Sequence, residues 1–175
     1  MSGHIRLHLE DAIARVTLSN PSKFNAMSRA MWRELRRVFN ELQQRSEVRA
    51  VVVAGEGGHF CAGGDIAEYT DFRFHPDGLR DFHENDVWGG LSAMLDCDVP
   101  IVARIAGACM GAGVEIASCC DIRIAATGAR FGAPIARLGF PMAPREAQLV
   151  AGAVGELTAR QMLLEAATFT APDML

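Results

Sequence analysis

The segment from Pro100 to Asp121, PIVARIAGACMGAGVEIASCCD, most constrains what this chain can fold into. Its apolar run 101–105 is too short for a solvent-facing helix and is typical of a buried strand. Glycines at 107, 111 and 113 then interrupt the run, and a helical stretch of small residues follows. A strand that breaks on glycine into a helix leaves backbone N–H groups free at the helix N-terminus, where negative charge is favoured.

The predicted helix carries a single acid, Glu115, three residues after Ala112. This spacing places both residues on one face of the helix, so a backbone donor and a carboxylate are predicted to lie side by side. A carboxylate in the apolar company of this segment should have a raised pKa, which suits general acid–base catalysis. The structural alternative is a first-turn acid that is stabilised by the helix dipole.

A second glycine-rich break lies about fifty residues earlier, which is near the upper range of structural repeats. Val48 to Ala54 is apolar and β-branched, which predicts a buried parallel strand, and GEGGHFCAGGDI (55–66) follows it. Within this glycine-rich stretch, residues 61–66 (CAGGDI) resemble residues 109–116 (CMGAGVEI), which contain two additional residues. We therefore expect two stacked strand–loop–helix units whose loops open on the same side.

The two breaks are predicted to direct the N–H groups of Gly64 and Ala112 at one oxygen atom, which is the arrangement of an oxyanion hole. A nucleotide-phosphate site is a competing hypothesis, but the chain has no GxxxxGK[ST] motif. Gly111-Ala112-Gly113 also lacks the third glycine of GxGxxG. The structural alternative is that these glycines serve only tight turns and close helix–strand packing.

Hydrophobic periodicity along the rest of the chain predicts an α/β domain. Residues 5–9 and 14–18 alternate as a β-hairpin, and Ser28 is a suitable N-cap for an amphipathic helix. Residues 69–77 are predicted to be an aromatic and polar loop that shapes the site or, alternatively, a surface loop with aromatic anchors. Residues 131–140 are predicted to be an ordered loop with at most one short strand. The other predicted elements are a helix marked by apolar residues from 79 to 95, a strand over 122–125, and helices over 144–150 and 158–166, the last with a capping box from Thr158 to Gln161.

Length and composition narrow the class of protein. The 175 residues are 50% apolar, enough for one core, and a net charge of −4 argues against nucleic-acid binding. No apolar run approaches membrane-spanning length, and the N-terminus has no signal core. The five cysteines form no CxxC pair and the histidines show no metal-ligand spacing. We expect a cytoplasmic protein with reduced cysteines and no metal.

Three motifs in order strongly resemble the enoyl-CoA hydratase/isomerase (crotonase) superfamily: HFCAGGDI, PIVARIAGACMGAGVEIASCCDIRIAA and FGAPIARLGFP. NPSKFNAMS also resembles the first CoA-contacting loop of that family. The resemblance implies the crotonase (ClpP-like) spiral fold of repeated ββα units and an acyl- or enoyl-CoA thioester substrate. Because CoA is part of the substrate, no separate cofactor is expected.

The resemblance also assigns roles to residues. The family's two oxyanion-hole donors map onto Gly64 and Ala112, and Glu115 matches the catalytic glutamate that orients and activates water. Phe24 stands where a basic residue is frequent in the family. The residues expected to contact CoA are Lys23, Ala26, Ala62, Gly63, Asp65 and Ile66.

The second catalytic glutamate of hydratases falls at Ile135, which cannot exchange a proton. Three hypotheses remain open. Glu115 acts alone or with water in slow hydration, isomerisation or another enolate reaction; or an acid of the pocket loop, such as Glu68, Asp71 or Asp86, replaces the missing one; or the protein binds CoA thioesters with little turnover.

Family members continue beyond the position of Leu175, with helices that cover the acyl pocket and complete a trimer. Residues 1–175 are therefore expected to form a single crotonase core domain without that segment. A homotrimer or dimer of trimers is expected where the segment is present.

Overall fold

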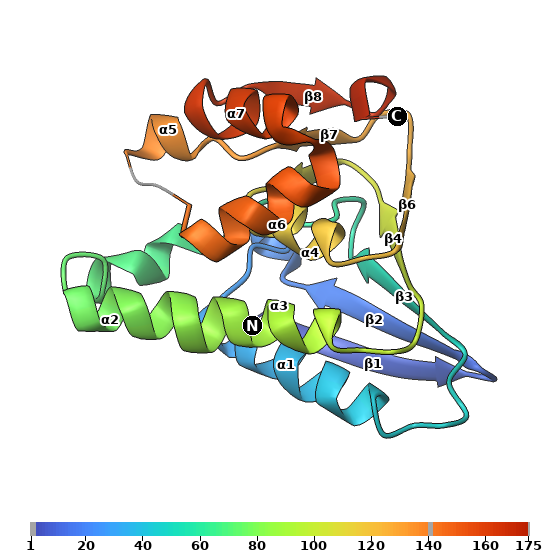
Figure 1. Cartoon of the computed structure of the whole chain (residues 1–175). Coiled ribbons are helices and arrows are strands. Elements are labelled where there is room, and N and C mark those ends of the chain that lie inside the picture. Colours follow the sequence, from blue (N-terminus) through green and yellow to red (C-terminus); the bar gives the residue numbers. More distant parts are fainter. Residues whose placement is uncertain (1–2, 140–141, 175) are drawn as a thin grey trace.

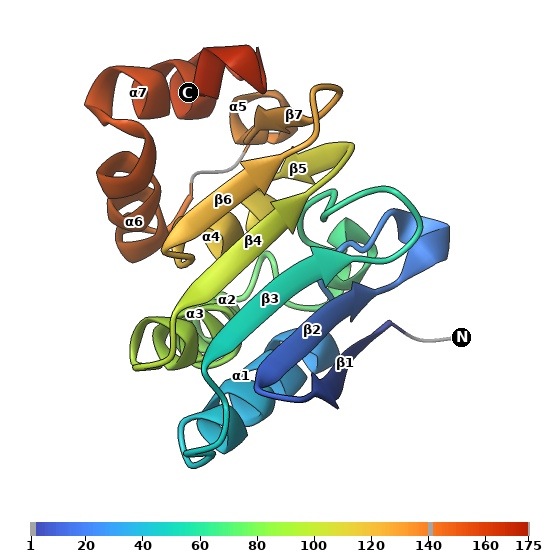
Figure 2. The same cartoon turned by 90° about the vertical axis from the view of Figure 1, so that its right-hand side faces the viewer.

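The computed structural model describes residues 3–139 and 142–174. Its main sheet has the strand order β1-β2-β3-β4-β6, and helices lie against one side of it (Figure 1, Figure 2). β1 and β2 are antiparallel, whereas β2, β3, β4 and β6 run parallel, so the predicted hairpin and the α/β class are confirmed. The strands span His4–Glu10, Ile13–Ser19, Ala50–Gly55, Ile101–Ile105 and Ile122–Ala125.

The chain repeats one pattern of main-sheet strand, short second-layer strand and helix. β4 is followed by β5 (Ala108–Met110) and α4 (Ala112–Ser118), and β6 by β7 (Arg130–Gly132) and α5 (Ile135–Leu138). After β3, an isolated bridge at Cys61 takes the place of the short strand, and the 3₁₀ helix η2 (Ile66–Asp71) follows.

The second-layer segments stack in the same order as the main-sheet strands. Cys61 pairs in parallel with Cys109 of β5, and β5 pairs in parallel with β7. β8 (Thr168–Thr170) closes this layer antiparallel to β7. The chain thus winds through successive ββα units, as predicted, and this winding brings the two glycine-rich breaks onto neighbouring positions.

Helix α1 (Arg29–Leu42) shows how the sequence forms these elements. Ser28 caps it by accepting a hydrogen bond from the Met31 N–H at 3.2 Å, and its apolar stripe is completely buried. α2 (Pro76–Asp81), a π-helical turn (Phe82–Val87) and α3 (Trp88–Leu95) form the predicted second helical stretch. The remaining elements are η1 (Pro21–Lys23), α6 (Pro144–Val154), α7 (Glu156–Leu164) and η4 (Pro172–Met174).

Three local predictions are wrong. Residues 69–77 are not one loop, because Asp65 caps η2 by accepting from the Ala67 N–H and Pro76 begins α2. Residues 131–140 contain α5, although Phe140 lies outside the described residues. The capping box at Thr158 does not form, because α7 already begins at Glu156, with the positive-φ residue Gly155 before it.

Within residues 3–139 and 142–174, no helix is long and apolar enough to cross a lipid bilayer. The same residues contain no group of three or more His, Cys, Asp or Glu side chains placed to hold a metal ion. All five cysteines are free and four of them are buried, in agreement with their predicted use as small apolar residues.

Candidate active site

The two glycine-rich breaks lie against each other. The Met110 N–H donates to the Cys61 carbonyl oxygen at 2.8 Å, which joins the second layer at this point. A Cβ atom on Gly113 would lie only 2.6 Å from the same carbonyl oxygen, and one on Gly111 would lie 3.5 Å from the Gly63 Cα. Gly111 also has a positive φ of 48°. The close approach of the two loops therefore depends on Gly113, and the positive φ of Gly111 favours glycine at the turn before α4.

Each break leaves a backbone donor free. Met27 pairs with both neighbours of Gly64: its N–H donates to the Gly63 carbonyl and its carbonyl accepts from the Asp65 N–H, both at 2.8 Å. Ala112 is the first residue of α4, so its N–H has no acceptor within the helix. Neither the Gly64 N–H nor the Ala112 N–H has an acceptor in the described part of the chain.

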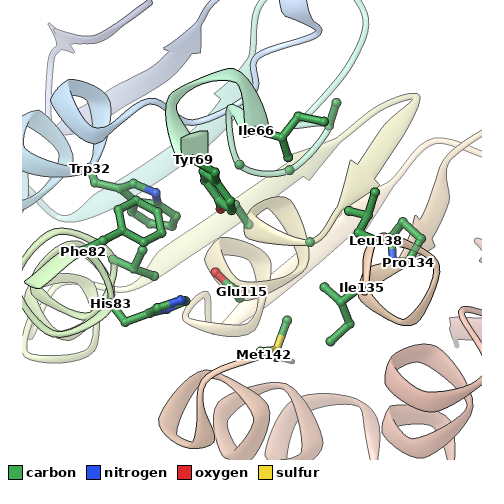
Figure 3. Close-up of a pocket in the computed structure, with 16 residues that line it drawn as sticks. Trp32, Ile66, Tyr69, Phe82, His83, Glu115, Pro134, Ile135, Leu138 and Met142 are labelled. Carbon is green, nitrogen blue, oxygen red and sulfur yellow. The ribbon is translucent and has the colours of Figure 1, made fainter. Parts of the chain in front are cut away.

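Both free donors border one pocket, which sixteen residues line (Figure 3). Figure 3 shows the Tyr69 hydroxyl and the His83 ring directed toward the Glu115 carboxyl group. Most of the other side chains are apolar: Trp32, Ile66, Phe82, Val87, Pro134, Ile135, Leu138 and Met142. The pocket thus combines two unused N–H donors with one carboxyl group in largely apolar surroundings.

Glu115 is held in an environment that disfavours its charge. The residue is buried in the first turn of α4, with 8% of its surface exposed. Burial, with a smaller contribution from the negative charge of Glu146, raises its pKa from 4.5 to about 8. A carboxyl group with such a pKa can both accept and donate a proton near neutral pH, as a general acid–base catalyst must.

Comparison with known proteins identifies the family of this chain. A sequence model of the family described as enoyl-CoA hydratase/isomerase matches residues 8–175. The chain belongs to the enoyl-CoA hydratase/isomerase family. It is 30% identical over 169 residues to a probable enoyl-CoA hydratase of Mycobacterium bovis, covering 97% of this chain and 64% of that protein.

Two further similarities agree with this membership. The chain is 32% identical over 172 residues to the mitochondrial Delta(3,5)-Delta(2,4)-dienoyl-CoA isomerase of Mus musculus, covering 93% of this chain and 51% of that protein. The crystal structure of an enoyl-CoA hydratase/carnithine racemase from Magnetospirillum magneticum superposes with a TM-score of 0.92 at 33% identity. The superposition covers 96% of this chain and 63% of that chain. The chain thus spans between about half and two thirds of the lengths of these relatives.

Both the family match and the structural similarity therefore show that the chain has the crotonase fold. Most of the predicted site residues lie together in the pocket wall: Ala62, Gly63, Gly64, Ile66, Ala112 and Glu115. Lys23 and Asp65 form an ion pair at 2.5 Å outside that wall. The loop that carries Lys23 and Ala26 still lies beside the first break, because the Ala62 N–H donates to the Phe24 carbonyl at 3.0 Å. The CoA contacts of these residues remain predictions.

Ile135 lines the pocket where the resemblance places the second glutamate of family hydratases. None of the three acids suggested as its replacement lies in the pocket wall. Glu68 accepts a hydrogen bond from the Arg29 N–H at 2.7 Å, and Asp86 is paired with Arg29 and Arg33. Asp71 is exposed at the end of η2. The hypothesis that one of these three acids replaces the missing glutamate is therefore wrong for this pocket.

Sequence reasoning missed Glu146. It lies in the first turn of α6 and is buried, and its carboxylate approaches His83, a residue of the pocket wall. No pattern in the sequence marks Glu146, because a first-turn acid is ordinary in a helix and its burial depends on the packing of α6 against α4.

The raised pKa of Glu115 predicts that stability depends on pH. Because the folded state favours the neutral carboxyl group, this contribution is complete below pH 4.5 and is lost as pH rises through about 8. The free energy of unfolding should fall over this range by about 1.4 kcal/mol per unit of pKa difference. Glu115→Gln, which has no charge to bury, should lack this part of the fall. Urea denaturation of both proteins across this range measures it, and identical pH dependence would contradict the raised pKa.

Tyr69 and Gly64 are in contact in the pocket wall. A Cβ atom on Gly64 would lie 2.3 Å from the Tyr69 hydroxyl oxygen and 3.2 Å from its ring carbon Cζ. Gly64→Ala should therefore displace the ring, whereas in a Tyr69→Phe background the closest atom is gone. We expect Gly64→Ala to reduce ligand binding and stability less in that background, with a coupling energy of about 1 kcal/mol. A double-mutant cycle by denaturation and calorimetry measures it, and strictly additive effects would contradict the contact.

Proposed function

We propose that this chain binds an acyl- or enoyl-CoA thioester and converts it through an enolate. The N–H groups of Gly64 and Ala112 donate to the thioester carbonyl oxygen, and Glu115 exchanges a proton with the bound acyl group or with water. One observation carries this proposal: two unused N–H donors and a carboxyl group of raised pKa border the same largely apolar pocket. The hydratase and isomerase names of its relatives support the substrate class.

The proposed chemistry follows from where charge develops. Removing a proton beside the thioester, or adding water to a conjugated double bond, moves an electron pair onto the carbonyl oxygen. Two fixed N–H donors in apolar surroundings stabilise that oxyanion, and each such donor is worth roughly 3–4 kcal/mol in the transition state. Glu115 accepts or donates the accompanying proton, and its pKa of about 8 suits both directions.

A panel of 2-enoyl- and 3-enoyl-CoA thioesters tests this function. Hydration or isomerisation of at least one substrate, with saturable kinetics, is the expected result. A second candidate, an acyl-CoA-binding protein with little turnover, is favoured by Ile135 in the pocket wall. Calorimetry that detects tight acyl-CoA binding, with no turnover across the panel, would select this second function. Absence of both binding and turnover would contradict the two proposals together.

A further inference from the structure

His83 and Glu146 form a polar pair at the pocket that the proposed function does not use. Adding water across a double bond needs two proton transfers, one from water and one to carbon, and Ile135 cannot take part in either. The only ionisable side chains among the described residues of the pocket wall are Tyr69, His83 and Glu115. The Tyr69 hydroxyl has a pKa raised by burial and by the charge of Glu115, which makes it a poor proton donor. His83 is therefore the group to consider.

Glu146 fixes the orientation of the His83 ring. Its carboxylate oxygen Oε1 lies 3.4 Å from the ring nitrogen Nδ1, a long separation of the kind that catalytic pairs show before a ligand binds. The side chain of Glu146 is 3% exposed, that of His83 25%. A buried carboxylate needs a hydrogen-bond donor, and within the described residues His83 is the side chain that supplies one. Nδ1–H therefore donates to Glu146.

This bond leaves the other ring nitrogen, Nε2, available to the pocket. The Phe82 ring stands edge-on to the imidazole at 5.1 Å and helps to hold its plane. Figure 3 shows the ring directed toward Glu115, whereas Ile135 lies on the other side of that carboxyl group. The pocket thus presents two groups that can carry a proton: Glu115 of α4, at a position expected by resemblance, and His83 of the π-helical turn, which differs from the expected glutamate at position 135.

We propose that His83, oriented by Glu146, is the second proton-transfer residue of this site and that the chain therefore hydrates 2-enoyl-CoA thioesters. This inference rests on the proposed function. In the step, the water oxygen bonds to C3, the C2=C3 π electrons move onto the thioester oxygen held by Gly64 and Ala112, and the water proton passes to Glu115. The enolate then collapses as C2 takes the Nε2 proton of His83, which enters the step as the doubly protonated imidazolium and leaves it as the neutral ring with Nδ1–H still donating to Glu146. Return of the proton from Glu115 to His83 through solvent completes the cycle.

His83→Gln tests the proposal directly. We expect kcat for 2-enoyl-CoA hydration to fall about 10²-fold, within the range for loss of one acid–base group, with the Kd for a saturated acyl-CoA changed less than about twofold. Exchange of the C2 hydrogens of that acyl-CoA in D₂O, followed by NMR, should fall by a similar factor. His75→Gln, at the exposed residue before α2, makes the same chemical change away from the pocket and should leave every value unchanged.

The role of Glu146 is positioning, and its variants separate that role from folding. Glu146→Ala should lower kcat with little change in KM, and ¹⁵N NMR of labelled histidine should show that His83 no longer keeps its proton on Nδ1. Glu146→Gln, whose side-chain oxygen can still accept from Nδ1–H, should restore that tautomer and part of kcat. An unchanged tautomer in Glu146→Ala would overturn the positioning role.

The inference and the proposed function fail in different ways. If the wild-type chain turns over no CoA thioester, the proposed function fails. If the wild type is an active hydratase and folded His83→Gln keeps kcat within about threefold, the function stands and the inference about His83 is overturned. Isomerisation without any hydration would also overturn it, because one proton carrier is enough for that reaction.

Discussion

Glu115→Gln is expected to lower kcat on the best CoA thioester by about 10²–10⁴-fold, because glutamine keeps the shape of the side chain and cannot exchange a proton. Steady-state kinetics measure the fall, and calorimetry with a saturated acyl-CoA should show nearly unchanged affinity. Glu165→Gln makes the same change at an exposed residue just after α7 and serves as the control. Full activity in Glu115→Gln would remove this residue from its proposed role.

Loss of folding would not explain the expected fall. Glu115→Gln removes a carboxyl group whose pKa is raised mainly by burial, so this variant should be at least as stable as the wild type near pH 8. An inactive variant that is more resistant to urea than its parent has lost a chemical group and kept its structure. This opposition between activity and stability is typical of residues that a protein retains for function.

The pH profile of the wild type supplies an independent check on Glu115. As a proton acceptor in the free protein it must be ionised, so kcat/KM should rise with pH and level off above about 8. If Glu115 acts first as a proton donor, it must be protonated in the free protein, and kcat/KM should instead fall as pH rises through about 8. A profile that is flat through pH 8 would contradict both roles.

The path of the chain through the site could be predicted because it depends on local signals. Short apolar runs gave the buried strands, and glycines at 63, 111 and 113 marked the places where two backbone segments meet. These glycines are needed for reasons visible in the sequence pattern: a turn after a strand and a helix start. The free donors of Gly64 and Ala112 followed from that pattern.

The remaining part of the site could not be predicted, because it comes from segments that are distant in sequence. Glu146 is buried only where α6 packs near α4, and its carboxylate meets a ring that lies 63 residues earlier in the chain. The α5 helix, which carries Ile135 into the pocket wall, is too short to show a periodicity. The prediction of one loop over residues 69–77 is wrong because two helices enter this interval. The start of η2 depends on Asp65, which lies before the interval, and the start of α2 depends on Pro76, which lies within it.

Ala112→Pro is expected to lower kcat by about 10²–10³-fold, the usual effect of removing one oxyanion-hole donor. Proline has no backbone N–H, and position N1 of a helix tolerates it because that N–H has no partner within the helix. Ala112 occupies N1 of α4, and Gly111 before it has no Cβ to clash with the proline ring. Steady-state kinetics on the same thioester measure the loss, and thermal denaturation confirms that α4 is retained.

Ala112→Ser is the matched control, because it keeps the N–H while adding one atom at the same buried position. If the N–H matters, the serine variant should stay within a few-fold of the wild type while the proline variant loses activity. Equal losses in both variants would show that packing at residue 112 is responsible and would contradict the oxyanion role.

Combining Ala112→Pro with Glu115→Gln shows whether the donor and the carboxyl group act in one transition state. Groups that act as a unit give losses that are far from additive, since removal of either one already abolishes most of the step they share. We expect the double variant to be little worse than Glu115→Gln alone. Losses that multiply would mean that Ala112 stabilises the bound thioester independently of proton transfer, as it would in a protein that binds CoA thioesters with little turnover.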